Sequence, residues 1–136
     1  MKKTVLLVED DMSLTNAIKT KLEKSGFAVV CADNSGDAMK RIHDPAVPID
    51  AIWLDHYLLG TGTGLDILEK TKNSKVYKHI PAFIVSNTAS PEKRHAYLKL
   101  GATQFYIKAE HRLEEIISDM RTSLAAADLS TGKGTA

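Results

Sequence analysis

Five short apolar runs recur along this chain at intervals of some 20 to 30 residues, and stretches with helical spacing lie between them. A short apolar run bounded by turn residues is typical of a strand buried on both faces of a parallel sheet. Strands alternating with helices predict an α/β fold, here a doubly wound parallel sheet of five strands with five helices. Right-handed crossovers leave few topologies, and we expect the flavodoxin-like strand order 2-1-3-4-5. The expected strands are Val5–Val8, Phe27–Cys31, Ala51–Leu54, Ala82–Val85 and Gln104–Ile107.

The intervening stretches carry helical periodicity and capping signals. The clearest amphipathic helix places on one face Leu113, Ile116, Ile117, Met120 and Leu124, and the first helix places there Leu14, Ile18 and Leu22. The middle helices are weaker, at Asp37–His43, Leu65–Lys72 and Glu92–Leu98. Asp11 is expected to cap the first helix, Thr63 with Asp66 to form a capping box, and Ser90-Pro91 to open the fourth helix. Gly26 and Gly101 stand where helices should end.

The composition fits one globular domain, which we place at residues 1–125, with a flexible tail at residues 126–136. A net charge of +1 gives no field that favours direct nucleic-acid binding. No apolar stretch approaches the roughly 18 residues that span a bilayer. The single cysteine, Cys31, excludes an intrachain disulfide and a thiolate metal cluster, and we expect a buried core thiol. The expected compartment is the cytoplasm.

Carboxylates follow two of the expected strands. Glu9, Asp10 and Asp11 follow the first apolar run, and Asp55 follows the third. These strands are neighbours where the strand order reverses, so their carboxyl ends share one crevice. Converging carboxylates raise one another's pKa values unless a cation compensates. A few carboxylates with open positions favour Mg²⁺, with Mn²⁺ as a substitute, and we expect a metal site there.

A hydroxyl and an ammonium group are expected at the same edge of the sheet. Ser86 follows the fourth run and Lys108 follows the fifth. Phosphoryl transfer needs a nucleophile, a metal, a hydrogen-bond donor and a cation. All four chemical types occur in strand order, so the pattern predicts phosphoryl chemistry at Asp55.

Over roughly residues 3 to 124 the sequence resembles the response-regulator receiver domains of two-component signalling. The resemblance is carried by Leu6–Asp10, Ile52–Asp55, Ile84–Ser86 and Gly101–Lys108. It implies that Asp55 accepts a phosphoryl group from a sensor histidine kinase or a histidine phosphotransfer protein. It also implies that Mg²⁺ is held by Asp10 directly, by Glu9 through water, by Asp55 and by the backbone carbonyl of Tyr57.

The resemblance further implies that Ser86 and Lys108 bind phosphoryl oxygens. Phe105, three residues before Lys108, takes the place of the switch aromatic, which turns inward as Ser86 moves toward the phosphoryl group. Phenylalanine has no hydroxyl, so switching by packing alone is expected. The leading hypothesis is a stand-alone module, a monomer or a phosphorylation-linked dimer. The resemblance implies that it presents a face of its fourth helix, fifth strand and fifth helix to an unidentified protein.

Several positions depart from the family pattern. Ala109 stands in place of the usual proline after the lysine, and a cis peptide before alanine costs about 3 kcal/mol, so a trans bond is expected. The loop after Asp55 has Leu59-Gly60 and one additional residue. Asn87 is bulkier than the usual residue after the hydroxyl. The phosphoryl lifetime is expected to depend on Tyr57, Asn87 and Thr88, with Tyr57 shielding the phosphoryl group from water.

Other functions remain open at this point. A phosphorelay intermediate would pass the phosphoryl group on to a histidine domain. A Mg²⁺-dependent phosphohydrolase would need a second acid two residues after the nucleophile, where Tyr57 stands, so we expect no external turnover. A flavin site would need a glycine-rich loop where the chain has Glu9 and Asp10. We expect Trp53 to be core, Gly60–Gly64 to be a plain connecting loop, and surface positions for most of the histidines, His43, His56, His79, His95 and His111.

Overall fold

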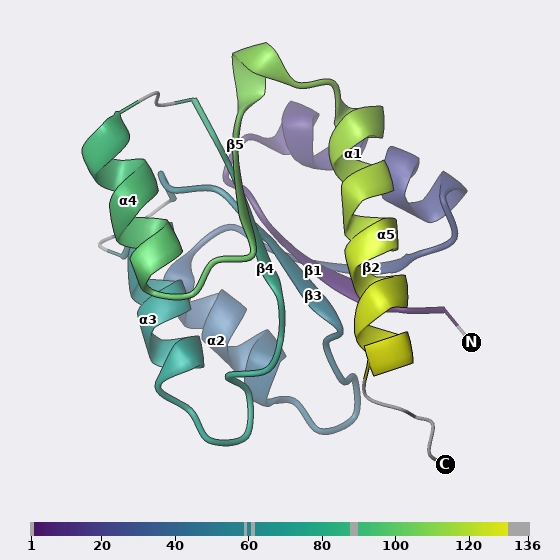
Figure 1. Cartoon of the computed structure of the whole chain (residues 1–136), viewed down its shortest axis with the longest axis horizontal. Coiled ribbons are helices and arrows are strands. Elements are labelled where there is room, and N and C mark those ends of the chain that lie inside the picture. Colours follow the sequence, from purple (N-terminus) through teal and green to yellow (C-terminus); the bar gives the residue numbers. More distant parts are fainter. Residues whose placement is uncertain (1, 59, 61, 88–89, 131–136) are drawn as a thin grey trace.

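The computed structural model of this chain describes residues 2–58, 60, 62–87 and 90–130. Within these ranges a five-stranded parallel sheet has the order β2-β1-β3-β4-β5, as predicted (Figure 1). The strands are β1 (Thr4–Val8), β2 (Ala28–Ala32), β3 (Ala51–Leu54), β4 (Ala82–Ser86) and β5 (Gln104–Ile107). The helices are α1 (Met12–Lys24), α2 (Ser35–His43), α3 (Gly64–Lys72), α4 (Pro91–Lys99) and α5 (Leu113–Ser130), with a short 3₁₀ turn, η1 (Lys108–Glu110), after β5.

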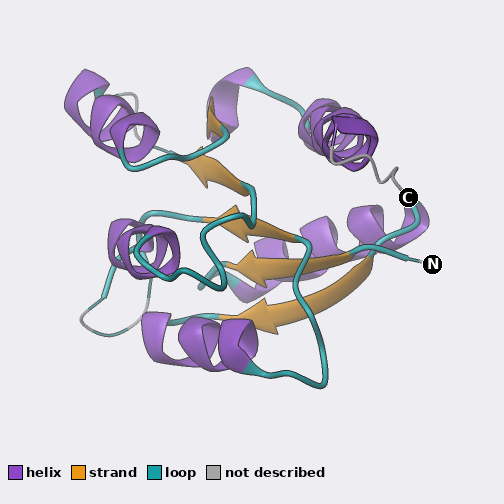
Figure 2. Ribbon diagram, turned by 60° about the horizontal axis from the view of Figure 1, so that its bottom comes forward, coloured by secondary structure: helices purple, strands orange, loops and turns teal. Residues whose placement is uncertain are grey.

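Helices cover both faces of the sheet (Figure 2). Alternate residues of β1 point to opposite faces, so Leu6 and Val8 pack with α2, α3 and α4, while Val5 and Leu7 pack with α1 and α5. All four residues of β3 are buried, and Trp53 is core, as predicted. Two apolar layers therefore hold the strands in place and fix where their carboxyl ends emerge.

The predicted helix caps are present. The Asp11 side chain accepts a hydrogen bond from the Leu14 N–H, and the Ser90 hydroxyl accepts one from the Lys93 N–H. Thr63 donates its backbone N–H to Asp66 Oδ2 at 2.9 Å, as in a capping box. The predicted bounds of the middle helices and of the strands differ from the observed ones by at most two residues.

Two predictions from the sequence need correction. Helix α5 continues through Ser130, so residues 126–130 are helical rather than part of a tail; residues 131–136 lie outside the described residues. Ala125, Ala126 and Ala127 favour helix, and Lys3 Nζ lies 2.9 Å from Asp128 Oδ1, which ties this last turn to the chain start. Cys31 is only half-buried rather than a core thiol. Over the described part of the chain, no helix is long and apolar enough to cross a membrane.

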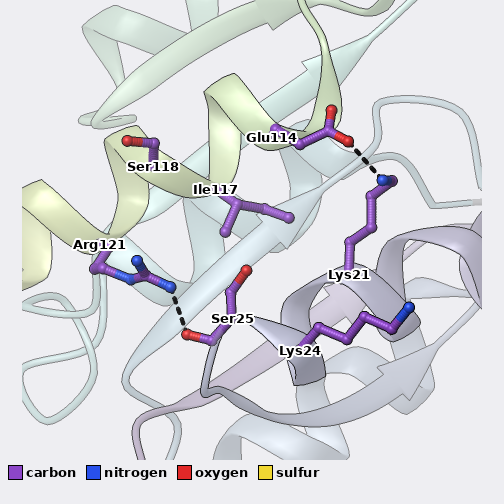
Figure 3. Close-up of a pocket in the computed structure, with 7 residues that line it drawn as sticks. All are labelled: Lys21, Lys24, Ser25, Glu114, Ile117, Ser118 and Arg121. Atoms are coloured by element: carbon purple, nitrogen blue, oxygen red, sulfur yellow. Dashed lines mark hydrogen bonds and ion pairs between the residues drawn. The ribbon is translucent and has the colours of Figure 1, made fainter.

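Helices α1 and α5 are joined by polar contacts along their shared edge (Figure 3). Lys21 Nζ lies 2.5 Å from Glu114 Oε2, and Arg121 donates to the Ser25 carbonyl oxygen at 2.6 Å. A pocket of about 230 Å³ lies between these residues. It is lined by helix residues of α1 and α5 and by Ser25, so it is separate from the strand-end acids.

Candidate functional site

Three of the predicted acids converge at the carboxyl ends of β1 and β3. Val8 pairs with Leu54 in the parallel register, so Glu9 and Asp55 leave the sheet side by side. The Asp55 N–H donates to the Val8 carbonyl oxygen at 3.0 Å. Carboxylate oxygens of Glu9, Asp10 and Asp55 all lie within 4.8 Å of one another. Asp11 stays apart as the α1 cap, as predicted.

The surroundings of Asp55 disfavour the ionised form of its carboxyl group. Its side chain is only 8% exposed, and Glu9 is buried beside it. Burial, reinforced by the charge of Glu9, raises the pKa of Asp55 to about 7, and the positive charge of Lys108 offsets this only in part. An electropositive partner at this position therefore strongly favours the ionised carboxylate.

Lys108 is the cation nearest to these acids in the described structure. Its Nζ donates to Glu9 Oε1 at 3.0 Å and lies 3.7 Å from Asp55 Oδ2. Lys108 immediately follows β5, and it opens η1. The strand end thus delivers the ammonium group to the acids of two other strands, as the sequence predicted.

Ser86 lies at the same edge of the sheet. It is the last residue of β4, fully buried, and pairs with Ile107, the residue before Lys108. The hydroxyl and the ammonium group therefore come from adjacent positions of neighbouring strands.

The donor set fits a hard divalent cation. Glu9, Asp10 and Asp55 offer oxygen ligands close enough to share one ion. Mg²⁺ prefers such ligands and retains several waters, so a few carboxylates suffice. Burial and the charge of Glu9 raise the pKa of Asp55, so a bound cation would offset the negative charge that these acids bring together.

Besides Ser86, three described residues were expected to govern switching and access, namely Phe105, Tyr57 and Asn87. Phe105 is buried and packs against Tyr97, with ring centroids 5.8 Å apart. Tyr57 is 53% exposed, and Lys93 of α4 donates a hydrogen bond to its hydroxyl. Asn87 is exposed. The predictions on Leu59 and Thr88 concern residues outside the described part of the chain.

The departure at Ala109 has the expected consequence. No peptide bond among the described residues is cis, and Ala109 lies inside η1. The chain turns away after Lys108 through this short helix. Lys108 still contacts Glu9, so the proline is not needed to place its ammonium group.

His56 is the exception to the surface positions expected for most of the histidines. It is buried, its backbone N–H donates to Asp55 Oδ1 at 2.8 Å, and its Nδ1 shares a 2.6 Å hydrogen bond with the Tyr97 hydroxyl. Its burial could have been predicted from its position, because it closely follows a fully buried strand. His43, His79 and His95 are exposed and His111 is half-buried.

Gly64 was also missed as a residue of the site. A Cβ at this position would lie 2.4 Å from the Asp55 carbonyl oxygen and 2.7 Å from the Tyr97 hydroxyl. The Gly64 N–H donates to the His56 carbonyl oxygen at 2.9 Å. Among the described residues, Gly60, Gly62 and Thr63 lie in the connection from β3 to α3, as predicted. Gly64 is instead the first residue of α3, and it permits the close approach of the Asp55 carbonyl and the Tyr97 hydroxyl.

Comparisons with known proteins agree with this geometry. The family model of the response regulator receiver domain matches residues 5–121. An NtrX-like response regulator of Rickettsia typhi is 35% identical over 105 residues, which are 76% of this chain and 21% of that protein. The phosphate regulon transcriptional regulatory protein PhoB of Escherichia coli is 28% identical over 108 residues, 79% of this chain and 46% of that protein. The chain thus spans less than half the length of these curated relatives.

Solved structures share the fold. A CheY-like receiver domain protein from Methanospirillum hungatei superposes with a TM-score of 0.85 at 22% identity, over 96% of this chain and 99% of that chain. The non-phosphorylated receiver domain of HemR from Leptospira biflexa has a TM-score of 0.78 at 28% identity, over 90% and 94% of the two chains. With the family model covering nearly the whole fold and the acids gathered at its switch point, this chain belongs to the response-regulator receiver domains of two-component signalling.

Proposed function

We propose that Asp55 accepts a phosphoryl group from a phosphohistidine of a sensor histidine kinase or a histidine phosphotransfer protein. The observation that carries this proposal is the cluster of three carboxylates within 4.8 Å of one another beside the Lys108 ammonium group. Acids alone would provide only a cation site. The added ammonium and the Ser86 hydroxyl provide partners for phosphoryl oxygens.

In the proposed transfer, a carboxylate oxygen of Asp55 forms a bond to phosphorus while the phosphorus–nitrogen bond of the donor imidazole breaks. The released imidazole takes up a proton from solvent. Lys108 pairs with negative charge on one phosphoryl oxygen, and the Ser86 hydroxyl donates to another. Glu9, Asp10, Asp55 and the Tyr57 carbonyl would hold Mg²⁺, which supplies further positive charge when bound.

Signalling would follow from the change at Asp55. We assign the switch to Ser86 and Phe105, and the phosphoryl lifetime to access past Tyr57, Asn87 and Thr88. Receiver domains are in general signalling modules and not enzymes that turn over an external substrate, and Tyr57 stands where a phosphohydrolase would carry its general acid. The proposed output is a protein partner at α4, β5 and α5, without direct contact to nucleic acid or membrane.

The proposal of a cytoplasmic, stand-alone module has its own test. An immunoblot of cell fractions would give the size and compartment of the native protein. A band near 14.9 kDa in the cytosolic fraction is the expected result, whereas a larger species would show an attached output domain. Light scattering with and without beryllofluoride would distinguish a monomer from a phosphorylation-linked dimer.

Labelling with acetyl phosphate and Mg²⁺ tests the acceptor. Intact mass should rise by one phosphoryl group, stable in acid and labile in base. Asp55→Asn should abolish the label, and Asp11→Asn should keep it because asparagine also caps a helix. Label that survives in Asp55→Asn would sink the assignment. A phosphorylated histidine domain added in place of acetyl phosphate would show whether transfer runs forward, backward or both ways.

A further inference from the structure

His56 and Tyr97 join the acceptor strand to helix α4. The Tyr97 side chain is fully buried, and its hydroxyl shares a 2.6 Å hydrogen bond with His56 Nδ1. The same tyrosine ring packs against Phe105 on β5, with centroids 5.8 Å apart. One side chain of α4 therefore contacts both the residue after Asp55 and the aromatic assigned to the switch.

The His56 backbone is held at both its N–H and its carbonyl oxygen. Its N–H donates to Asp55 Oδ1 at 2.8 Å, and its carbonyl oxygen accepts the Gly64 N–H at 2.9 Å. Its ring is held by Tyr97. Because Oδ1 is engaged in this way, the orientation of the carboxylate is fixed and Oδ2 is the oxygen that faces Lys108 at 3.7 Å.

Space around this contact is tight. A Cβ on Gly64 would lie 2.7 Å from the Tyr97 hydroxyl, so α3 reaches the hydroxyl only with glycine at that position. A movement of α4 would therefore displace the tyrosine hydroxyl, break or bend its bond to His56, and disturb the peptide that orients Asp55. The reverse also holds, since coupling between two sites is reciprocal.

We propose that His56 and Tyr97 are a positioning pair: their hydrogen bond fixes the peptide that orients the Asp55 carboxylate, and it couples the state of that carboxylate to helix α4. This inference rests on the proposed function of Asp55. A purely structural reading of the same bond is that a buried tyrosine hydroxyl needs a partner and His56 supplies one. The two readings differ in what they predict for phosphorylation.

The experiment compares four single variants. Tyr97→Phe removes only the hydroxyl, His56→Leu removes the ring nitrogens, and His56→Asn keeps a polar group close to the position of Nδ1. Tyr106→Phe is the matched control, because the Tyr106 hydroxyl donates to Asp119 Oδ2 at 2.7 Å on the α5 face of the sheet. Each is labelled with acetyl phosphate and Mg²⁺ beside the wild type, and thermal unfolding confirms which variants are folded.

Loss of the pair should slow labelling about five-fold in both Tyr97→Phe and His56→Leu, as expected for one lost hydrogen bond. The double variant should be no slower than either single one, because both act through the same contact. His56→Asn should restore most of the rate, and Tyr106→Phe should label within about two-fold of wild type. Amide exchange in residues 92–99 should respond to phosphorylation in the wild type and lose that response in Tyr97→Phe.

The outcomes separate the two proposals. Wild-type protein that takes no label overturns the proposed function and this inference with it. Labelled wild type, with Tyr97→Phe as fast as Tyr106→Phe and an unchanged exchange response in α4, overturns only the positioning pair. If Tyr97→Phe does not fold, the comparison of His56→Leu with His56→Asn decides: equal rates overturn the pair, and faster labelling of His56→Asn supports it.

Discussion

At the scale of single residues, the structure shows one role of Lys108, and the proposed function adds a second. Its ammonium group donates to Glu9 and lies close to Asp55, so it compensates two buried acids before any phosphoryl group arrives. The same group is the proposed partner of a phosphoryl oxygen. Lys108 contacts two carboxylates and is not committed to a single partner, so its ammonium group could also pair with a phosphoryl oxygen.

Removal of the Lys108 ammonium group should lower the unfolding free energy, and a bound divalent ion should restore part of it. Lys108→Met leaves the nearly inaccessible Glu9 carboxylate without its ammonium partner, which costs about 3 kcal/mol of unfolding free energy. Urea unfolding in EDTA should show this loss, and added Mg²⁺ should recover a large part of it. Lys21→Met, which breaks the exposed pair with Glu114, should change stability by less than about 1 kcal/mol in either buffer.

Asp55 makes the metal-free protein less stable as the pH rises. Its pKa is about 7 in the folded protein and 3.8 in the absence of folded structure, so the folded state binds the proton more tightly. The unfolding free energy therefore falls as the pH rises from about 4 to about 7 and stays low above. Asp55→Asn should remove this dependence and, at pH 8 in EDTA, stabilise the protein by about 3 kcal/mol. A parallel pH profile for wild type and Asp55→Asn would contradict the raised pKa, and Asp11→Asn is the control.

At the scale of elements, the start of α3 sets the distance between the acceptor strand and α4. Gly64 is the first residue of α3, and a Cβ on it would clash with the Asp55 carbonyl oxygen and the Tyr97 hydroxyl. A larger residue would have to push the helix away from both. The packing of α3 and the geometry around Asp55 therefore both require a residue without a Cβ at position 64.

Gly64→Ala should accordingly cost about 2 kcal/mol of unfolding free energy through overpacking. It should also slow Asp55 labelling, because the displaced contacts include the His56 peptide. Gly36→Ala on α2 is the control: its Cβ would meet only Asn34 Oδ1, at 3.3 Å, so its effect should stay within about 1 kcal/mol. Equal effects of the two substitutions in urea unfolding and labelling would refute the steric argument.

Elements with a local pattern were predictable from the sequence, and so was the meeting of acids and lysine at the strand ends, whereas the contacts of buried side chains between helices and loops were not. The buried strand Ala51–Leu54 is apolar throughout, so its place, and Asp55 at its end, follow from the sequence. The bond between His56 and Tyr97 spans 41 positions and leaves no local trace. Helix α4 was weakly patterned because Tyr97 is its one buried residue among those described. The last turns of α5 were missed although three alanines at residues 125–127 favour helix, and the contact of Lys3 with Asp128 that supports these turns spans 125 positions.

At the scale of the whole molecule, two apolar layers bring groups from four strands to one edge. Glu9 and Asp10 follow β1, Asp55 follows β3, Ser86 ends β4 and Lys108 follows β5. None of these residues lies near another in the sequence apart from the first pair. The site therefore exists only in the folded chain, and anything that binds it must stabilise the fold.

Mg²⁺ should therefore raise the thermal unfolding midpoint of the intact protein. A ligand at 100 times its dissociation constant adds about 2.7 kcal/mol, which for a domain of this size corresponds to a rise of about 9 °C. The shift should disappear in Asp10→Asn, which removes a member of the acidic cluster, and persist in Asp11→Asn, where the exposed neighbour is changed instead. Differential scanning calorimetry in EDTA and in Mg²⁺ measures both. Since unfolded carboxylates bind Mg²⁺ only weakly, equal shifts in the two variants would place the ion outside the cluster of Glu9, Asp10 and Asp55.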